Sequence, residues 1–344
     1  MTSSGKQRRC LLIRQADGTY QLTIEESALP EPAEREVLVR VRAASLNRRD
    51  VYIIRGQYPM QPRPKLVPLS DGAGEVVGCG SAVTRFKVGD RVAACFFQRW
   101  IGGRPSADTH SSALGGQLDG MLSEYVCLSE GGLVSAPEGY SFEEAATLPC
   151  AAVTAWNGLV TRGRMQPGDH ILILGTGGVA IFGLQFAAAA GGRPIVITSS
   201  DAKFARVKQL GAASTINYSK IPQWSDAVRA ATGGVGAHQI LEVGGLGTLQ
   251  QSLASLAAGG HIALIGGLAG FGGDIPAMAL LHANATASGI YVGSRANFQA
   301  MNAFIERHRI RPVIDRVFEF EDAAAAYEHV EAGRHFGKVV IRLR

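Results

Sequence analysis

The sequence predicts an α/β protein of two domains, one rich in β-strands and one built on a doubly wound parallel sheet. Three observations support this prediction. The chain has 344 residues, of which 46% are hydrophobic and 18% charged, enough to bury two cores. Short alternating runs broken by Gly, Pro and Asp fill residues 36–128, a pattern typical of strands and tight turns. From residue 170 onward, apolar strand-like runs alternate with helical segments, which indicates a parallel sheet.

Short strands and one long loop are expected in the β-rich part. The strands are predicted at residues 11–13, 37–42, 74–77, 90–93 and 123–126. Between the last two, residues 96–120 are rich in Gly and Ser and indicate a loop of a length that is commonly functional. At the C-terminal end, helices are predicted at 298–308 and 321–332, followed by a closing strand at 338–343.

The parallel part begins with an apolar strand at 171–174, which leads into a helix over 179–190 that Gly191 ends. Further strands are predicted at 195–198, 214–216, 239–243, 261–265 and 289–292. Together these segments make a six-stranded parallel sheet. Six strands are what a complete doubly wound dinucleotide-binding domain contains.

Composition and charge narrow the class of protein. The net charge of +5 comes from Lys and Arg scattered along the chain, so a small-molecule partner is favoured over nucleic acid. No apolar run reaches the roughly 20 residues of a membrane span, and no signal-peptide pattern opens the chain. We therefore expect a cytoplasmic protein without membrane contact. The five cysteines lie far apart without metal-ligand spacing, which indicates neither a disulfide framework nor a structural zinc site.

A glycine-rich turn is the sharpest motif. It follows the strand at 171–174 and opens the next helix, the context in which a G-x-G-x-x-A pattern predicts dinucleotide binding. Its first glycine permits the tight turn, its second lets the backbone approach a pyrophosphate, and the helix N-terminus attracts the anion. The residues of the turn are Gly175, Thr176, Gly177, Gly178 and Val179.

The end of the second strand decides which dinucleotide is expected. An NAD enzyme usually has a carboxylate there, about 20 residues past the glycines, for the ribose 2′-hydroxyl. This chain has Ser199 and Ser200 instead, followed by Lys203. Hydroxyls and an ammonium group suit a 2′-phosphate, so NADPH is predicted over NADH. Asp201 is the complication, since it could turn toward the ribose or cap the next helix.

These residues, together with several other segments, resemble the medium-chain dehydrogenase/reductase superfamily, and most closely its zinc-lacking, zeta-crystallin-like quinone oxidoreductase branch. The resemblance covers nearly the whole chain. It implies a GroES-like β-rich catalytic domain from residues 1–149 and 294–344, and a Rossmann NADP(H)-binding domain from residues 150–293, with a cleft joining them. The matching segments are Asn47–Tyr52, Arg55–Pro59, Gly74–Val77, Phe86–Val92, Ala145–Pro149, Val153–Trp156 and Gly337–Val340.

The resemblance also bears on metal binding. Zinc-dependent members of the superfamily bind a catalytic metal through Cys, His and Cys, and at the matching positions this chain has Asn47, Ser70 and Cys150. A catalytic zinc needs about three protein ligands, and only one is present here. The sequence therefore predicts an enzyme without zinc and with no metal ligands.

Without a metal, hydrogen-bond donors must polarise the substrate. The resemblance points to Tyr52 as the donor and to Asn47 as an orienting group, although Tyr52 could also serve only to pack. Further cofactor contacts are implied, each of which could instead be structural. They are Thr154 near the nicotinamide, Tyr218 near the adenosine, Lys338 at the pyrophosphate, Gly244, Gly266 and Gly267 at the ends of later strands near the ribose and nicotinamide, and Tyr291, Gly293, Ser294 and Arg295 after the last strand.

Three functions remain open from the sequence. The first is an NADPH-dependent reductase of quinones, enones or small carbonyl compounds, and the second is an alcohol dehydrogenase with or without zinc. The third is a redox-silent NADPH-binding protein. The family resemblance also implies a homodimer, formed by edge-to-edge pairing of the strand predicted at 289–292.

Overall fold

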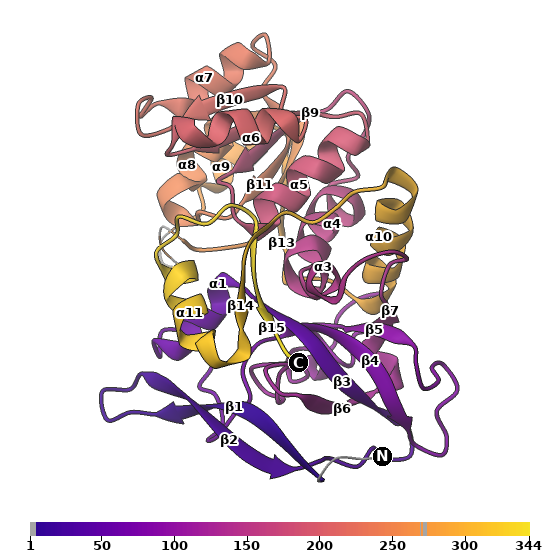
Figure 1. The fold of residues 1–344 in the computed structure, drawn as a ribbon. Helices are drawn as coiled ribbons and strands as arrows, with labels where there is room; N and C mark the ends of the chain where they lie inside the picture. Colours follow the sequence, from indigo (N-terminus) through magenta and orange to yellow (C-terminus); the bar gives the residue numbers. More distant parts are fainter. Residues whose placement is uncertain (1–4, 269, 271–273) are drawn as a thin grey trace. The chain divides into compact units, whose positions relative to one another are not determined.

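The chain forms two compact units in the computed structural model, which describes residues 5–268, 270 and 274–344 (Figure 1). The first unit comprises Met1–Val153 and Gly293–Arg344, and the second comprises Thr154–Val292. The boundaries predicted from the sequence were 149/150 and 293/294, and those of the structure are 153/154 and 292/293. The first unit is therefore built from both ends of the chain.

A seven-stranded sheet organises the first unit. Its strands follow the order β14-β15-β3-β4-β5-β7, with β6 also paired to β3, and a separate antiparallel pair is formed by β1 and β2. The strands are β1 (Lys6–Arg14), β2 (Tyr20–Ala28), β3 (Glu36–Leu46), β4 (Asp71–Cys79), β5 (Arg91–Ala94), β6 (Tyr125–Ser129), β7 (Leu133–Ser135), β14 (Ile314–Glu319) and β15 (Lys338–Arg342).

Short helices lie between these strands. The long loop predicted at 96–120 contains one helical turn, α2, and is held by an isolated bridge between Phe97 and Ala113. The helical segments of this unit are α1 (Arg48–Ile54), α2 (Ala107–His110), η1 (Glu130–Gly132), α3 (Phe142–Ala146), the π-helical turn η2 (Leu148–Ala152), α10 (Arg295–His308), η5 (Phe320–Asp322) and α11 (Ala323–Glu331).

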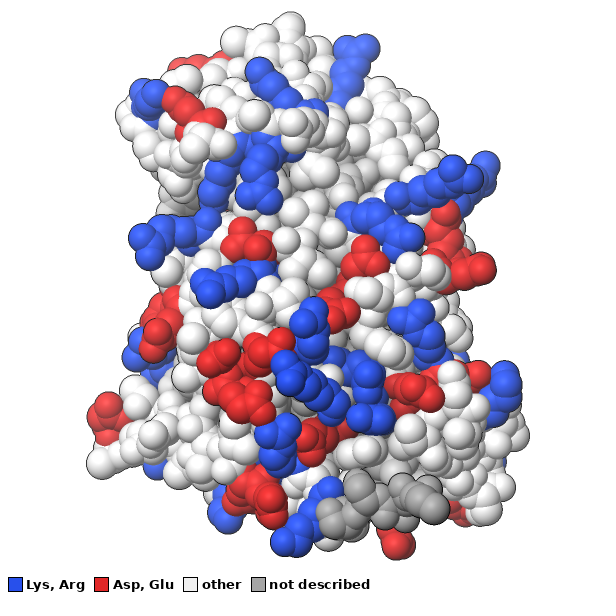
Figure 2. All heavy atoms as spheres, viewed as in Figure 1, with Lys and Arg blue, Asp and Glu red and all other residues white. Residues whose placement is uncertain are grey.

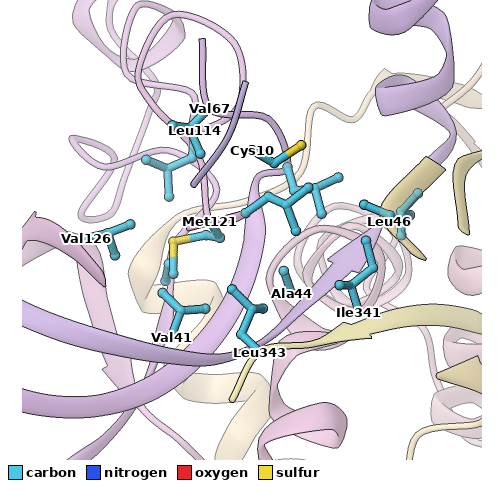
Figure 3. Close-up of a cluster of buried hydrophobic side chains, with 14 of the residues drawn as sticks. Cys10, Val41, Ala44, Leu46, Val67, Leu114, Met121, Val126, Ile341 and Leu343 are labelled. Atoms are coloured by element: carbon cyan, nitrogen blue, oxygen red, sulfur yellow. The ribbon is translucent and has the colours of Figure 1, made fainter. Parts of the chain in front are cut away.

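The core of the first unit is formed where both ends of the chain meet. Inward-facing residues alternate along β3, and Val41 and Ala44 from this strand are fully buried. Figure 3 shows them with Ile341 and Leu343 from the C-terminal end and with Met121. Each buried Val, Leu, Ile or Met side chain of this kind contributes roughly 1.5–3 kcal/mol when removed from water. This packing fixes β15 beside β3.

The second unit carries a six-stranded sheet in which every pair is parallel, in the order β10-β9-β8-β11-β12-β13. This is the doubly wound Rossmann arrangement, so the predicted α/β fold class is confirmed. Its elements are α4 (Val153–Trp156), the π-helical turn η3 (Asn157–Arg162), β8 (His170–Leu174), α5 (Gly178–Ala189), β9 (Arg193–Thr198), η4 (Asp201–Lys203), α6 (Phe204–Gln209), β10 (Ser214–Asn217), α7 (Trp224–Ala231), β11 (Ala237–Glu242), α8 (Leu246–Ala254), β12 (Leu256–Leu264), α9 (Ala277–His282) and β13 (Thr286–Gly289).

One predicted strand of this sheet was wrong in its position. The sequence predicted it at 289–292, but β13 ends at Gly289. Val292 has a φ of 57°, in the left-handed region, and a strand cannot continue through that conformation. β13 lies at the edge of the sheet, and the homodimer that this edge would form stays a prediction.

Charged groups of both signs lie interspersed on the face of the first unit that Figure 2 displays. Ion pairs in this unit include Arg55 with Glu331 and Arg342 with Glu143. That face has no field of a single sign, which a nucleic-acid-binding stripe would create. Among the residues that the structure describes, no helix has the length and apolar character needed to cross a membrane.

Candidate functional site

The glycine turn joins β8 to α5 in the second unit. Gly175 has a φ of +79°, which a glycine adopts without strain, and its N–H donates to the carbonyl of Ile197 at 2.7 Å. Gly177 has an ordinary φ of −76°, and a Cβ placed on it would meet no atom within 4 Å. The fold therefore does not require glycine at position 177. Open space there leaves the backbone accessible to a close-lying ligand.

The N-terminus of α5 faces the same turn. Gly178 and Val179 begin this twelve-residue helix, whose first backbone N–H groups have no partners within the helix. Such N–H groups and the positive end of the helix dipole attract anions. The residues present thus fit a dinucleotide pyrophosphate.

Lys203 lies beside the turn. Its Nζ donates to Oγ1 of Thr176 at 3.0 Å, so the end of β9 and the glycine turn are joined by a side-chain hydrogen bond. Ser199 is exposed, and Ser200 stands at the N-cap position of the short helix η4 without a side-chain capping hydrogen bond. The groups that the sequence predicted for a 2′-phosphate are therefore gathered in one region, next to the predicted pyrophosphate site.

Asp201 follows Ser200 in this region and is paired with two other side chains. Its Oδ1 accepts from Nδ2 of Asn217 at 2.6 Å, and its Oδ2 pairs with Lys220. The hydrogen bond from Lys220, followed by that from Asn217, lowers the pKa of Asp201. Its charge is thus partly balanced. Tyr218 follows Asn217, is exposed, and donates its backbone N–H to Thr198.

A buried carboxylate that sequence reasoning missed lies at the end of β11. Glu242 is fully buried and accepts the N–H of Gly244 at 2.7 Å, the N–H of Gly245 at 3.1 Å and the hydroxyl of Thr248 at 2.6 Å, while Ser252 donates to its other oxygen. Burial raises the pKa of Glu242, and these donors oppose the rise. The Gly244 N–H is thereby already bonded within the protein.

The polar site of the first unit lies where three neighbouring strands end. The antiparallel register pairs Val339 of β15 with Leu46 of β3, and Ser45 with Asp71 of β4. Lys338, the first residue of β15, therefore lies beside the end of β3 and the start of β4. Its Nζ donates to the Leu46 carbonyl at 2.7 Å and to Oδ1 of Asn47 at 2.6 Å, and lies 3.6 Å from Oδ2 of Asp71.

The Asp71 carboxylate is fully buried among donors. Ser70 donates its hydroxyl to Oδ1 at 2.8 Å, and the backbone N–H of Cys150 donates to Oδ2 at 3.3 Å. Burial raises the pKa of Asp71, while the Lys338 ammonium and the neighbouring donors oppose the rise. Removing one partner of a buried ion pair typically costs about 3–5 kcal/mol. We therefore expect Asp71 and Lys338 to depend on each other for stability.

The same residues do not fit a catalytic zinc. Asn47 and Ser70 are engaged by Lys338 and Asp71, and desolvation, followed by the Asp71 charge, raises the pKa of the Cys150 thiol, whereas zinc binds the thiolate. The Lys338 ammonium also lies among these residues, bonded to Asn47 and close to Asp71. Within residues 5–268, 270 and 274–344, no group of three or more His, Cys, Asp or Glu is arranged to hold a metal.

Helix α1 carries Tyr52 one turn beyond the polar site. Asn47 caps this helix, and its N–H donates to Oδ2 of Asp50 at 2.8 Å. The Arg48 guanidinium lies over the Tyr52 ring, 5.4 Å from its centre. Burial raises the pKa of Asp50 to about 6, although Arg49 opposes this. Asn47 and Tyr52 thus lie on one short element, at its start and one turn on.

Several residues predicted to contact cofactor have structural partners. Ser294 caps α10 by accepting the Asn297 N–H, and Arg295 donates to the Gly131 carbonyl at 3.0 Å. A Cβ at Gly266 would meet the Val243 carbonyl at 2.7 Å, and one at Gly293 would meet the Val153 side chain. Other members of the set lie as follows: Thr154 is buried in α4, Gly267 is buried after β12, and Tyr291 is exposed after β13.

Comparisons with known proteins agree with this architecture. The alcohol dehydrogenase GroES-like domain family matches residues 33–138, and the zinc-binding dehydrogenase family matches residues 178–307. A zinc-type alcohol dehydrogenase-like protein of Schizosaccharomyces pombe is 46% identical over 334 residues, which cover 95% of this chain and 96% of that protein.

Two solved structures extend the likeness to the whole fold. A candidate alcohol dehydrogenase from Sinorhizobium meliloti 1021 has a TM-score of 0.93 and 39% identity, covering 99% of this chain and 100% of that one. A protein described as an NAD-dependent alcohol dehydrogenase has a TM-score of 0.88 and 32% identity, covering 98% of this chain and 100% of that chain.

A GroES-like β-rich unit joined to a Rossmann unit defines a nucleotide-dependent oxidoreductase class. The chain belongs to the medium-chain dehydrogenase/reductase superfamily, and its relatives there include proteins named alcohol dehydrogenase-like and quinone oxidoreductase-like.

Proposed function

We propose that this chain is a zinc-independent, NADPH-dependent oxidoreductase that reduces a small carbonyl, enone or quinone substrate. The observation that carries the proposal is the open backbone at Gly177 with Lys203 beside it. A ligand that lay on this backbone would have its pyrophosphate at the N-terminus of α5. The Lys203 ammonium and the hydroxyls of Ser199 and Ser200 would then suit a 2′-phosphate.

Reduction also needs a group that stabilises charge on the substrate oxygen. When bound, NADPH supplies the hydride that adds to a carbon of the substrate. Tyr52 has a phenolic O–H that can donate to the substrate oxygen, and Asn47 can orient the same oxygen through its amide. General acid assistance of this kind contributes about 10²–10⁴ in rate. The donor set at Asn47, Ser70 and Cys150 supports a reaction that does not use zinc.

The second candidate function is alcohol dehydrogenation with NAD. It is favoured by the names of two relatives, one a zinc-type alcohol dehydrogenase-like protein and the other an NAD-dependent alcohol dehydrogenase. A redox-silent NADPH-binding protein is the third. The three differ in metal content, in dinucleotide preference and in whether any acceptor is reduced.

Metal analysis and cofactor oxidation on the purified chain separate these functions. We expect less than stoichiometric zinc, no loss of activity after dialysis against a chelator, and oxidation of NADPH with at least one acceptor from a panel of quinones, enones and aldehydes. We also expect a lower Michaelis constant for NADPH than for NADH. Stoichiometric zinc needed for turnover, or a clear NADH preference, would overturn the proposal. Binding of NADPH without oxidation by any acceptor would indicate the redox-silent function.

A further inference from the structure

Lys338 is a buried cation of the first unit, and the sequence assigned it to the cofactor pyrophosphate only by resemblance. We infer that Lys338 is instead a positioning residue that fixes the orientation of the Asn47 side chain. The inference rests on the proposed function, in which Asn47 orients the substrate oxygen. It deepens that function by naming the group that sets the direction of the Asn47 amide.

The hydrogen bond between the two side chains determines which end of the amide faces which way. A lysine ammonium has three donors and no acceptor. The Asn47 atom 2.6 Å from Nζ is therefore the carbonyl oxygen Oδ1, and the NH₂ end must point away from Lys338. The amide nitrogen has no partner in hydrogen-bonding geometry among the described residues. Lys338 thus sets the amide with its oxygen toward the ammonium and its nitrogen on the side of the Asp71 carboxylate, whose pKa the Asn47 side chain helps to lower.

The ammonium is held in place by groups of the first unit alone. The Leu46 carbonyl accepts from Nζ at 2.7 Å, and the Asp71 carboxylate lies 3.6 Å away. Lys338 is 3% exposed and Asp71 is fully buried. A cation that has two acceptors and a buried counter-ion has little remaining capacity for a pyrophosphate. This is the reason for assigning Lys338 to Asn47 rather than to the cofactor.

The backbone of Lys338 is fixed as firmly as its side chain. Its N–H donates to the Val313 carbonyl at 2.9 Å. Gly337, just before it, has a φ of +86°, and a Cβ there would meet the same carbonyl at 2.3 Å. Only glycine is tolerated in this tight approach. The start of β15 therefore presents the lysine to Asn47 in one position.

Substitution of Lys338 separates a positioning role from a cofactor contact. The variants are Lys338→Met, Lys338→Arg and Asn47→Ala, together with the pair Asn47→Ala/Lys338→Met. Lys87→Met serves as the matched control, because Lys87 is exposed and pairs with Asp90 on the surface of the same unit. Since Lys338→Met leaves the Asp71 carboxylate without its cation, Asp71→Asn/Lys338→Met is made as well. This variant keeps the test possible if the single change does not fold.

We expect Lys338→Met to lower kcat by about tenfold or more while the Kd for NADPH changes by less than about twofold. Lys338→Arg, which can still donate to Oδ1, should recover part of the loss. In Asn47→Ala/Lys338→Met the decrease in kcat should be smaller than the product of the decreases in the two single variants. The reason is that each single change already removes the correctly oriented Asn47 amide. A tenfold weaker NADPH affinity with unchanged kcat, or losses that multiply, would overturn the inference.

A measurement without turnover distinguishes failure of the inference from failure of the proposed function. The side-chain ¹⁵N–¹H₂ resonances of Asn47, assigned by comparison with Asn47→Ala, report on the amide directly. We expect them to shift in Lys338→Met and in Asp71→Asn/Lys338→Met but not in Lys87→Met. Resonances unchanged by removal of the lysine would contradict the inference whatever the wild-type chain reduces. If the wild-type chain reduced no acceptor but the Asn47 resonances shifted in the Lys338 variants, the proposed function would be wrong and the inference about Lys338 would stand.

Discussion

The ammonium nitrogen of Lys203 lies 3.0 Å from the hydroxyl oxygen of Thr176. One hydrogen bond thus connects the glycine turn with the residues that follow the second strand of the sheet. The glycine turn, expected to bind the pyrophosphate, therefore lies next to Lys203, expected to bind the 2′-phosphate. Substitution of Lys203 is for this reason the most direct test of dinucleotide preference.

Lys203→Met should reduce the preference for NADPH over NADH. The change removes a cation that would face the 2′-phosphate, which NADH lacks, so the Kd for NADPH should rise by about tenfold with little change for NADH. Binding of both dinucleotides is measured by fluorescence titration. Lys208→Met, at an exposed position on the adjoining helix α6, is the matched control. An equal rise in the Kd for both dinucleotides would contradict the assignment of Lys203 to the 2′-phosphate.

Gly177→Ala should weaken dinucleotide binding without harming the fold. The new methyl group would meet no protein atom within 4 Å, so thermal stability should be unchanged or slightly raised. It would fill the space in which a ligand approaches the backbone, and we expect the Kd for NADPH to rise about tenfold. Gly289→Ala is the control, because a Cβ there also meets nothing. If affinity were unaffected, the ligand would not lie against Gly177.

The parts of the structure that the sequence predicted depend on local patterns. The run of apolar residues before Gly175 and the helix after it follow from periodicity and from glycine spacing within a few residues. The six parallel strands follow from the same alternation. Lys203 could be placed because only a few residues separate it from the end of its strand. In each case the signal and the structure it predicts lie close together in the chain.

The parts that could not be predicted depend on pairing between distant segments. Asn47, Asp71 and Lys338 meet because β15 pairs with β3 and β3 with β4, and no local pattern predicts that register. Glu242 ends an apolar strand like many solvent-facing carboxylates, and only the folded turn reveals its four donors. The misplaced last strand has a different cause, since the positive φ of Val292 is unusual for a β-branched residue.

Tyr52→Phe should lower turnover at least about tenfold and leave NADPH affinity nearly unchanged. The phenylalanine retains the ring that packs under Arg48 and removes only the hydroxyl donor. Stopped-flow measurement of NADPH oxidation with the best acceptor gives the rate, and fluorescence titration gives the affinity. Tyr20→Phe, in β2 of the same unit, is the control. An unaltered rate would leave Tyr52 with a packing role only.

Asp50→Asn should change how the stability of the protein depends on pH. Burial raises the pKa of Asp50 from 3.8 to about 6 in the folded state, so between these values the unfolded chain loses a proton that the folded chain keeps. This contribution to stability is fully present below pH 3.8 and is lost as the pH rises through 6. The asparagine does not titrate, and its carbonyl can still accept the Asn47 N–H.

The stability of Asp50→Asn relative to wild type should therefore increase between pH 4 and pH 7, by at most about 3 kcal/mol. Urea unfolding of both proteins at a series of pH values measures the difference. Asp17→Asn is the control, because hydrogen bonds from Thr19 lower the pKa of that exposed aspartate and place its titration below this range. A flat difference for Asp50→Asn would mean that Asp50 is charged in the folded protein throughout, with Arg49 and Lys338 compensating for its burial.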